Sequence, residues 1–200
     1  RLATVLALLG MIVAGLTGWY LYDASRALLM DSAQSKLLTA TGVMARRISI
    51  SRAESSRDLL VLAQHPDTRL LVGATDPKAR ERLEALMASM LLSNPSYLQI
   101  RLIGRQDHGL ERVRVDRHDG TAFPVSDVDM QEKGHFDYVS ETLNMSPGQT
   151  YASRIVINRD AGVHAGEGKP TVVVGMPVSD AKGVALGVVA INLDLQGAFE

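Results

Sequence analysis

The sequence opens on an uncharged, strongly apolar stretch over residues 2–22, flanked by Arg1 and Asp23. About 20 apolar residues at ~1.5 Å rise each span a hydrocarbon core of ~30 Å, and such a segment must be helical in lipid. Trp19 and Tyr22 lie at its far end, where aromatic rings favour the membrane interface. We therefore predict a transmembrane helix, with a cleaved signal peptide or a buried core helix as the alternatives. Arg1 favours a cytoplasmic N-terminus, which places the chain from Asp23 onward outside.

Residues 23–63 contain no proline, and their apolar residues recur in steps of three and four, which predicts a helix continuing out of the membrane. One interpretation is that this stripe packs on the helix's own domain, and another is that it pairs with a second copy as a signalling rod. The two interpretations are compatible, because one end of the helix can pair with a second copy while the other end packs on its own domain. The stripe consists of Met30, Ala33, Leu37, Ala40, Met44 and Ile48.

Two short helices follow, because proline and capping residues interrupt the chain. Pro66 ends the long helix, since the residue before a proline is disfavoured in the helical conformation, and a short helix then runs to Val72. Asp76 and Pro77 supply an N-cap and a first-turn residue for a second helix, which Asn94 and Pro95 end.

The hydrophobic period changes to two from Ser96, which predicts strands. The alternation over residues 97–103 and 110–117 predicts a β-hairpin with one apolar and one polar face. It places Tyr97, Gln99 and Arg101 on one side of the first strand, and it separates Glu111, Val113 and Val115 from Arg112, Arg114 and Asp116 in the second.

The remaining chain predicts one further helix and three strands. Residues 128–143 are expected to be helical, with a possible break at Gly134, and residues 150–158 are expected to form a strand. Residues 171–178 and 184–193 are nearly continuous runs of Val, Ala and Ile, so they should be central strands covered on both faces. The predicted fold class is α+β, with an antiparallel sheet of about five strands and helices on one side.

Composition excludes several function classes. A net charge of −1 gives no indication of a nucleic-acid-binding surface, and the absence of cysteine excludes disulfides, thiol catalysis and Cys-ligated zinc. No histidine pair has the spacing of a helical zinc site, and the glycine-rich residues 162–169 fail the spacing of a phosphate-binding loop. We predict no metal, no cofactor and no catalytic site in these residues.

The polar face of the first hairpin is the candidate site. Arg114 and Asp116 share a face, and Arg101 joins them if the register allows. The alternative is a solvated face of a half-buried sheet. Convergent Arg, Tyr and Asn side chains would suit a small, anionic ligand.

Several strings resemble the double-Cache class of extracytoplasmic sensor domains, which has a PAS-like sheet. They are Tyr97-Leu98-Gln99-Ile100-Arg101-Leu102-Ile103, Gly109-Leu110-Glu111-Arg112-Val113-Arg114-Val115-Asp116, Gln131-Glu132-Lys133, Tyr151-Ala152-Ser153, Ile157-Asn158-Arg159, Pro177-Val178-Ser179-Asp180 and Ile191-Asn192-Leu193. The resemblance covers about residues 24–195. Together with the patterns above, it implies a transmembrane helix over residues 1–22, a juxtamembrane signalling helix over 23–63 and a membrane-distal sensor module over 64–200. The membrane-proximal module and the output domain of that family are absent or lie beyond Glu200, and we expect a second span beyond it.

The amino-acid-binding branch of that family holds its ligand with an Arg-x-aromatic-aromatic string, a later Tyr and an Asp on the last strand. By position, Phe136 stands where the Arg would be and Asn192 where the Asp would be, so both charged groups are replaced. The resemblance therefore disfavours an α-amino acid ligand. The predicted pocket lies between the sheet and residues 128–143, and its candidate residues are Arg114, Tyr138, Tyr151 and Asn192, followed by Arg101, Asp116 and Ser153.

These observations predict the small-ligand sensing input of a bacterial transmembrane signalling protein. We expect a sensor histidine kinase of a two-component system, with a diguanylate cyclase or a chemoreceptor as alternatives. The expected location is the bacterial inner membrane, with the sensor domain periplasmic or extracellular, and the expected assembly is a homodimer. A membrane-tethered interaction domain without a small ligand and a tethered hydrolase are the other hypotheses.

Overall fold

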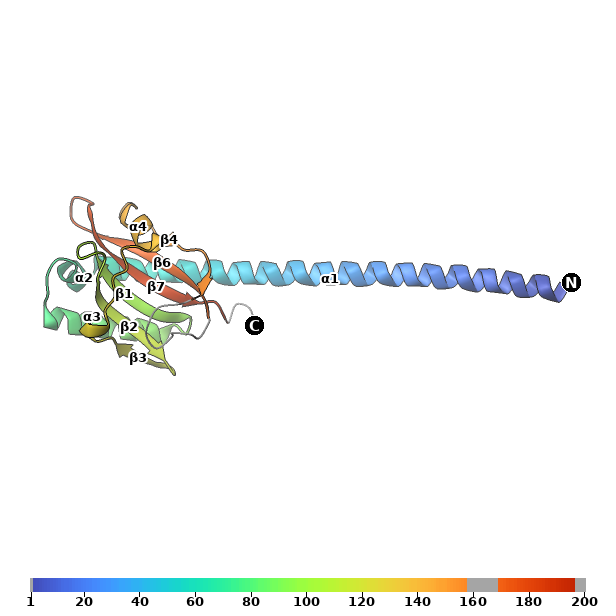
Figure 1. Cartoon of the computed structure of the whole chain (residues 1–200), viewed down its shortest axis with the longest axis horizontal. Helices are drawn as coiled ribbons and strands as arrows, with labels where there is room; N and C mark the ends of the chain where they lie inside the picture. The colour runs from blue at the N-terminus through green and yellow to red at the C-terminus, as the bar shows by residue number, and fades with distance from the viewer. Residues whose placement is uncertain (1, 158–168, 197–200) are drawn as a thin grey trace. The chain divides into compact units, whose positions relative to one another are not determined.

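The computed structural model describes residues 2–157 and 169–196 (Figure 1). The chain forms two compact units, Arg1–Arg46 and Arg47–Glu200. Helix α1 (Leu2–Gln64) includes a window that is long and apolar enough to cross a membrane, judged by length and composition. The second unit contains the last turns of α1 and every later element.

The short helices begin where proline and capping residues predict. Helix α2 (Pro66–Leu71) begins with Pro66 in its first turn. Helix α3 (Pro77–Ser93) begins after Asp76, whose side chain accepts a hydrogen bond from the backbone N–H of Ala79 at 3.0 Å. This cap satisfies one of the donors that the first turn leaves unpaired.

The sheet is antiparallel, and its strands follow the order β3-β2-β1-β7-β6-β4, with β5 paired to β6 (Figure 1). The α+β prediction is confirmed, but within residues 2–157 and 169–196 the sheet has 7 strands rather than about five. The strands are β1 (Tyr97–Gly104), β2 (Glu111–His118), β3 (Thr121–Pro124), β4 (Tyr151–Ala152), β5 (Val156–Ile157), β6 (Pro170–Ser179) and β7 (Ala185–Asp194).

The two extra strands have local causes. Asp119 and Gly120 both have positive φ, at 47° and 76°, and this turn folds β3 back onto β2 as a hairpin, beyond the predicted strand over residues 110–117. The strand predicted over residues 150–158 is divided into β4 and β5. The glycine-rich residues 162–169 lie, except for Lys169, outside the described residues.

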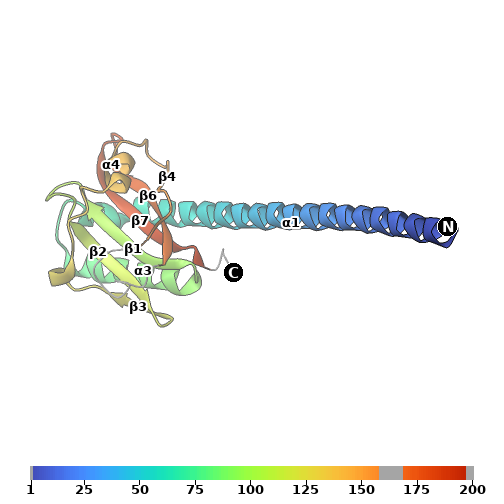
Figure 2. The ribbon, with the colours of Figure 1, turned by 45° about the vertical axis from the view of Figure 1, so that its right-hand side comes forward.

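Helices cover both faces of the sheet, whereas the sequence predicted them on one side. The end of α1, α2 and α3 bury one face, and Figure 2 shows α3 beside β1 and β2. Helix α4 (Asp137–Leu143) packs against β6 and β7 on the other face through Tyr138 and Val139, which contact Val173, Val188 and Ala190. Strands β6 and β7 are therefore buried on both sides, as their uninterrupted apolar runs predict.

The helix predicted over residues 128–143 is interrupted. A short 3-10 turn, η1 (Asp127–Asp129), comes first, and α4 begins only at Asp137. Between them the backbone N–H of Lys133 donates to Gly109 O at 2.8 Å, and that of Gly134 donates to His108 O at 2.9 Å. These bonds to the β1–β2 turn replace helical ones and fix the start of α4.

Candidate functional site

Two irregularities in β1 decide which side chains face the candidate site. A register shift relative to β7 between Tyr97 and Gln99 directs Tyr97 into the helix-covered core, while Gln99 and Arg101 face the opposite side. The prediction that these three side chains share one face was therefore wrong for Tyr97. β-Bulges of this kind redirect side chains next to functional sites.

A second shift, relative to β2, lies between Leu102 and Ile103. It brings Glu111 beside Arg114, although simple alternation assigned Glu111 to the face of Val113. The polar face of the hairpin consequently contains a second carboxylate that sequence reasoning missed.

The polar face is buried rather than solvated, so that alternative is excluded. Gln99, Arg101, Glu111, Arg114 and Asp116 are each at most 2% exposed. A buried charge is tolerated when it is paired and hydrogen-bonded. Each of the four charged groups has an oppositely charged neighbour and takes part in at least one hydrogen bond.

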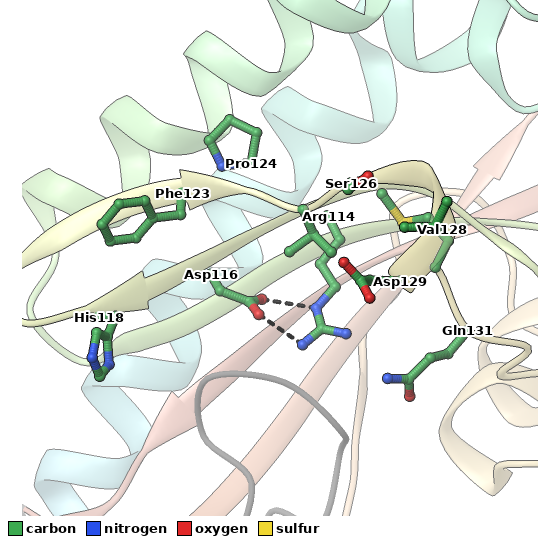
Figure 3. Close-up of a pocket in the computed structure, with 11 residues that line it drawn as sticks. Arg114, Asp116, His118, Phe123, Pro124, Ser126, Val128, Asp129 and Gln131 are labelled. Carbon is green, nitrogen blue, oxygen red and sulfur yellow. Dashed lines mark hydrogen bonds and ion pairs between the residues drawn. The ribbon is translucent and has the colours of Figure 1, made fainter.

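Arg114 and Asp116 form a two-point ion pair on β2. Arg114 Nε donates to Asp116 Oδ1 at 2.8 Å, and Nη2 donates to Oδ2 at 2.7 Å (Figure 3). Arg114 Nη1 also lies 3.7 Å from Glu111 Oε2, and Glu111 Oε1 lies 3.5 Å from Arg101 Nη1. Two guanidinium groups and two carboxylates thus balance one another.

The network continues from Arg101 to α4 and β7. Arg101 Nη1 donates to the hydroxyl of Tyr138 at 3.2 Å, and Nη2 donates to Gln99 Oε1. The same Gln99 oxygen accepts a hydrogen bond from Asn192 Nδ2 at 3.0 Å. One connected polar network, which we call the buried polar network, therefore runs from Asp116 to Asn192.

A cavity of about 570 Å³ lies between α4 and strands β4 to β7, and we call it the α4 cavity. It contains four of the predicted site residues, Tyr138, Tyr151, Ser153 and Asn192. Its other lining residues are Phe136, Asp137, Glu141, Arg154, Val156, Ile157, Thr171 and Val173. The size suits a small metabolite.

A second cavity of about 780 Å³ lies between β2, β3 and residues 125–131, and we call it the β2 cavity. Arg114 and Asp116 line it, as do His118, Phe123, Pro124, Val125, Ser126, Val128, Asp129, Met130 and Gln131. Figure 3 shows the Arg114 guanidinium extending toward Asp116, with Asp129 and Gln131 on its other side. The predicted set is therefore divided between two cavities, and Arg101 lines neither of them.

Besides Glu111, the residues that sequence reasoning missed fall into two groups. Gln99 lies two positions before Arg101 on the same strand face, so period-two alternation alone could have found it. Asp137, Glu141 and Arg154 come from α4 and the segment after β4, and local patterns give no sign that these segments meet. Within residues 2–157 and 169–196, no His, Cys, Asp or Glu cluster could hold a metal ion.

No protein-family model matches the sequence, and no match is found among curated proteins. Solved structures do match. A domain of a Vibrio parahaemolyticus protein assigned to the sensory box/GGDEF family superposes with a TM-score of 0.68 at 19% identity, over 82% of this chain and 60% of that one. The extracellular domain of a protein assigned as a histidine kinase gives 0.67 at 19%, over 82% and 57%.

The chain has the Cache, PAS-like fold of extracellular sensor domains. The ligand-binding domain of the Campylobacter jejuni chemoreceptor Tlp3, in complex with L-norvaline, is a further Cache-like neighbour, with a TM-score of 0.52 and 13% identity over 83% of this chain and 62% of that one. This Cache-like chain spans about three-fifths of the length of each of these neighbours.

Proposed function

We propose that this chain is the ligand-sensing input region of a bacterial transmembrane signalling protein, in first place a sensor histidine kinase. A diguanylate cyclase or a chemoreceptor is the alternative output. The fold is shared with sensory domains of all three kinds. The observation that carries the proposal is the α4 cavity. Tyr138 reaches it from α4, Tyr151 from β4, Ser153 from the segment after β4 and Asn192 from β7.

The proposed mechanism begins with closure of α4 on the ligand. Tyr138 connects α4 to Arg101 on β1, and the opposite face of β1 packs on the last turns of α1. A ligand that binds one arrangement of α4 more tightly than another shifts that equilibrium, and the sheet passes the change to α1. In this proposal residues 2–22 anchor the protein in the inner membrane, with the sensor unit in the periplasm or extracellular space.

The proposed assembly is a homodimer formed along α1. Within the first unit, Met30, Ala33, Leu37 and Ala40 of the predicted apolar stripe are exposed. Exposed apolar stripes of this extent favour helix pairing. The same observation favours the second candidate function, a tethered interaction domain without a small ligand.

The ligand experiment compares the two cavities. The full chain in detergent micelles is screened by thermal unfolding against small organic acids, amines and polyols. The sequence predicts that Arg114→Ala, in the β2 cavity, abolishes a ligand-induced rise in Tm, whereas the proposal above predicts that Tyr151→Leu, in the α4 cavity, does so. The variant that loses the shift identifies the cavity, and the absence of any shift for wild-type protein favours the interaction domain.

The location experiment is a topology assay. Alkaline phosphatase fused after Glu200 is active only outside the cytoplasm. Activity of the fusion supports the proposed orientation, and an inactive fusion overturns it.

Crosslinking through a cysteine introduced at Leu37 tests the dimer, with Arg105→Cys on the second unit as the control.

A further inference from the structure

The β2 cavity has exposed apolar side chains at its rim. Phe123 and Val128 line it and are 48% and 89% exposed, and Pro124 beside them is exposed as well. Figure 3 shows Phe123 on one side of the Arg114–Asp116 pair and Val128 on the other. Apolar side chains that are exposed together around a hollow mark an interaction site more often than single ones do. The β2 cavity therefore has the character of a docking groove.

The charged groups at the base of this cavity balance one another. Arg114 and Asp116 are buried, and the guanidinium of Arg114 donates to both carboxylate oxygens of Asp116 and lies 3.7 Å from Glu111 Oε2. The walls above them include the half-buried side chains of Val125 and Met130. An occupant of the cavity therefore gains mainly by placing apolar side chains against these walls.

The segment that forms β3, η1 and the rim of the cavity is acidic. Residues 119–132 include four acidic residues and no basic one, although the whole chain has a net charge of only −1. The four carboxylates are all exposed, and they belong to Asp119, Asp127, Asp129 and Glu132. Asp129 lines the cavity itself. A concave surface with one sign of charge attracts ligands of the opposite sign.

The basic residues next to this segment are directed toward other partners. Arg80 on α3 forms ion pairs with both Asp127 and Glu84, so two carboxylates share one guanidinium. Arg117 donates to two backbone carbonyls where α3 leads into β1, and Lys133 is buried. The exposed formal charge along residues 119–132 therefore stays negative.

We infer that the β2 cavity docks a short, cationic, amphipathic peptide. Its apolar side chains enter between Phe123 and Val128, and its Lys or Arg side chains meet Asp127 and Asp129. Carboxylates spread along the rim favour an occupant with several positive charges over a small molecule with one. In the described part of the chain β3 pairs only with β2, so its outer edge can also pair with an extended peptide backbone. The inference goes beyond the small-ligand proposal and does not rest on it, because the two cavities share no lining residue.

The experiment compares three matched peptides, each carrying a fluorophore: acetyl-Leu-Lys-Leu-Lys-Leu-Lys-amide, its Leu-Glu counterpart and its Ser-Lys counterpart. Fluorescence anisotropy measures their affinities for the full chain in uncharged detergent micelles, with empty micelles as the blank. We expect the Leu-Lys peptide to bind about tenfold or more tightly than both counterparts, because one lacks the charge and the other the apolar side chains. Added salt should weaken its binding, and hydrogen exchange of residues 121–131 should slow when it binds.

Rim variants test the site without disturbing the core. Asp127→Asn and Asp129→Asn alter exposed side chains and should each weaken binding of the Leu-Lys peptide by about two- to fivefold. Val128→Ser should weaken it by about three- to tenfold through lost apolar contact. Asp31→Asn on α1 and Val184→Ser before β7 alter exposed residues of the same types elsewhere, and these matched controls should leave the affinity unchanged. Circular dichroism shows that each variant is folded.

Several results would overturn the inference. They are equal binding of the Leu-Lys peptide and either counterpart, binding no greater than to empty micelles, and binding indifferent to the three rim variants. Phenethylamine is the small-molecule probe: if it slows exchange of residues 121–131 and the Leu-Lys peptide does not, the occupant is a small hydrophobic cation and the peptide inference is wrong. The small-ligand screen tests the α4 cavity separately, so either proposal can fail while the other stands.

Discussion

The hydroxyl of Tyr97 donates a hydrogen bond to Oδ2 of Asp58 at 2.6 Å and joins the first strand of the sheet to helix α1. Burial, followed by the hydrogen bond to Asp58, raises the pKa of Tyr97 well above its ordinary range, so this donor keeps its proton at all physiological pH values. Gln99, two residues further along β1, faces the opposite side of the sheet and contacts Asn192. The residues at the start of β1 therefore contact both the signalling helix and the polar network behind the α4 cavity.

The first prediction is that Tyr97→Phe destabilises the second unit by about 1.5–3 kcal/mol, since a hydrogen bond to a charged acceptor is lost. Denaturant unfolding measures the change. A double-mutant cycle with Asp58→Ala should give a coupling energy of at least ~0.5 kcal/mol. Tyr20→Phe removes a hydroxyl from an exposed ring and is the control, with no change expected. Additive effects at positions 97 and 58 would contradict the assignment.

The strands and helices could be predicted largely because their signals are local. Pro66, Asp76 and Asn94 delimit α2 and α3 through backbone restrictions and caps, and the apolar runs of β6 and β7 indicate central strands. The β3 strand was missed because it has only 4 residues and ends in Pro124, although the Asp-Gly pair before it is a hairpin signal.

The candidate site could be predicted only in part, because bulges and long-range contacts determine it. Alternation places Arg114 and Asp116 on one face correctly, but the shift at Leu102 and Ile103 that adds Glu111 depends on pairing with β2. The approach of α4 to β7, which puts Tyr138 and Asn192 in one cavity, is a tertiary contact with no local signal, and only the resemblance to the sensor family predicts that the two residues share a pocket. The ligand-binding role of the predicted residues stays a prediction.

The second prediction concerns the charge balance of the buried polar network. Asp116→Ala leaves the Arg114 guanidinium without its two-point partner in a buried setting, and we expect a loss of about 3–5 kcal/mol in the free energy of unfolding. Replacing both residues, by Arg114→Met with Asp116→Leu, removes the unpaired charge and should cost less than Asp116→Ala alone. A double variant less stable than the single one would show that the ion pair itself supplies net stability.

The third prediction concerns acid stability. Arg82 donates to Asp67 through Nε at 2.9 Å and Nη2 at 2.6 Å, and these hydrogen bonds hold the pKa of the Asp67 carboxyl below its usual range. A carboxyl whose pKa is lower in the folded than in the unfolded chain binds fewer protons in the folded state. Its contribution to the free energy of unfolding is therefore complete above about pH 4 and is lost as pH falls through the folded-state pKa. Unfolding free energies measured from pH 6 downward should fall less steeply below pH 4 in the Asp67→Asn variant than in the wild-type protein. Arg82→Gln should reduce the slope in the same way, and an unchanged slope in both would contradict this account.

The fourth prediction tests how the β1–β2 turn positions α4. A Cβ at Gly134 would lie 2.4 Å from His108 O, and the two segments are joined there by backbone hydrogen bonds from Lys133 and Gly134. Gly134→Ala should therefore separate the turn from the start of α4 and lower stability by about 1–3 kcal/mol, within the range of strained backbone sites. Because α4 carries Tyr138, hydrogen exchange of residues 137–143 should accelerate in this variant. Gly73→Ala, at a position where a Cβ meets nothing within 4 Å, is the control and should change neither measurement. Unaltered exchange in α4 with Gly134→Ala would show that packing on β6 and β7 alone holds the helix in place.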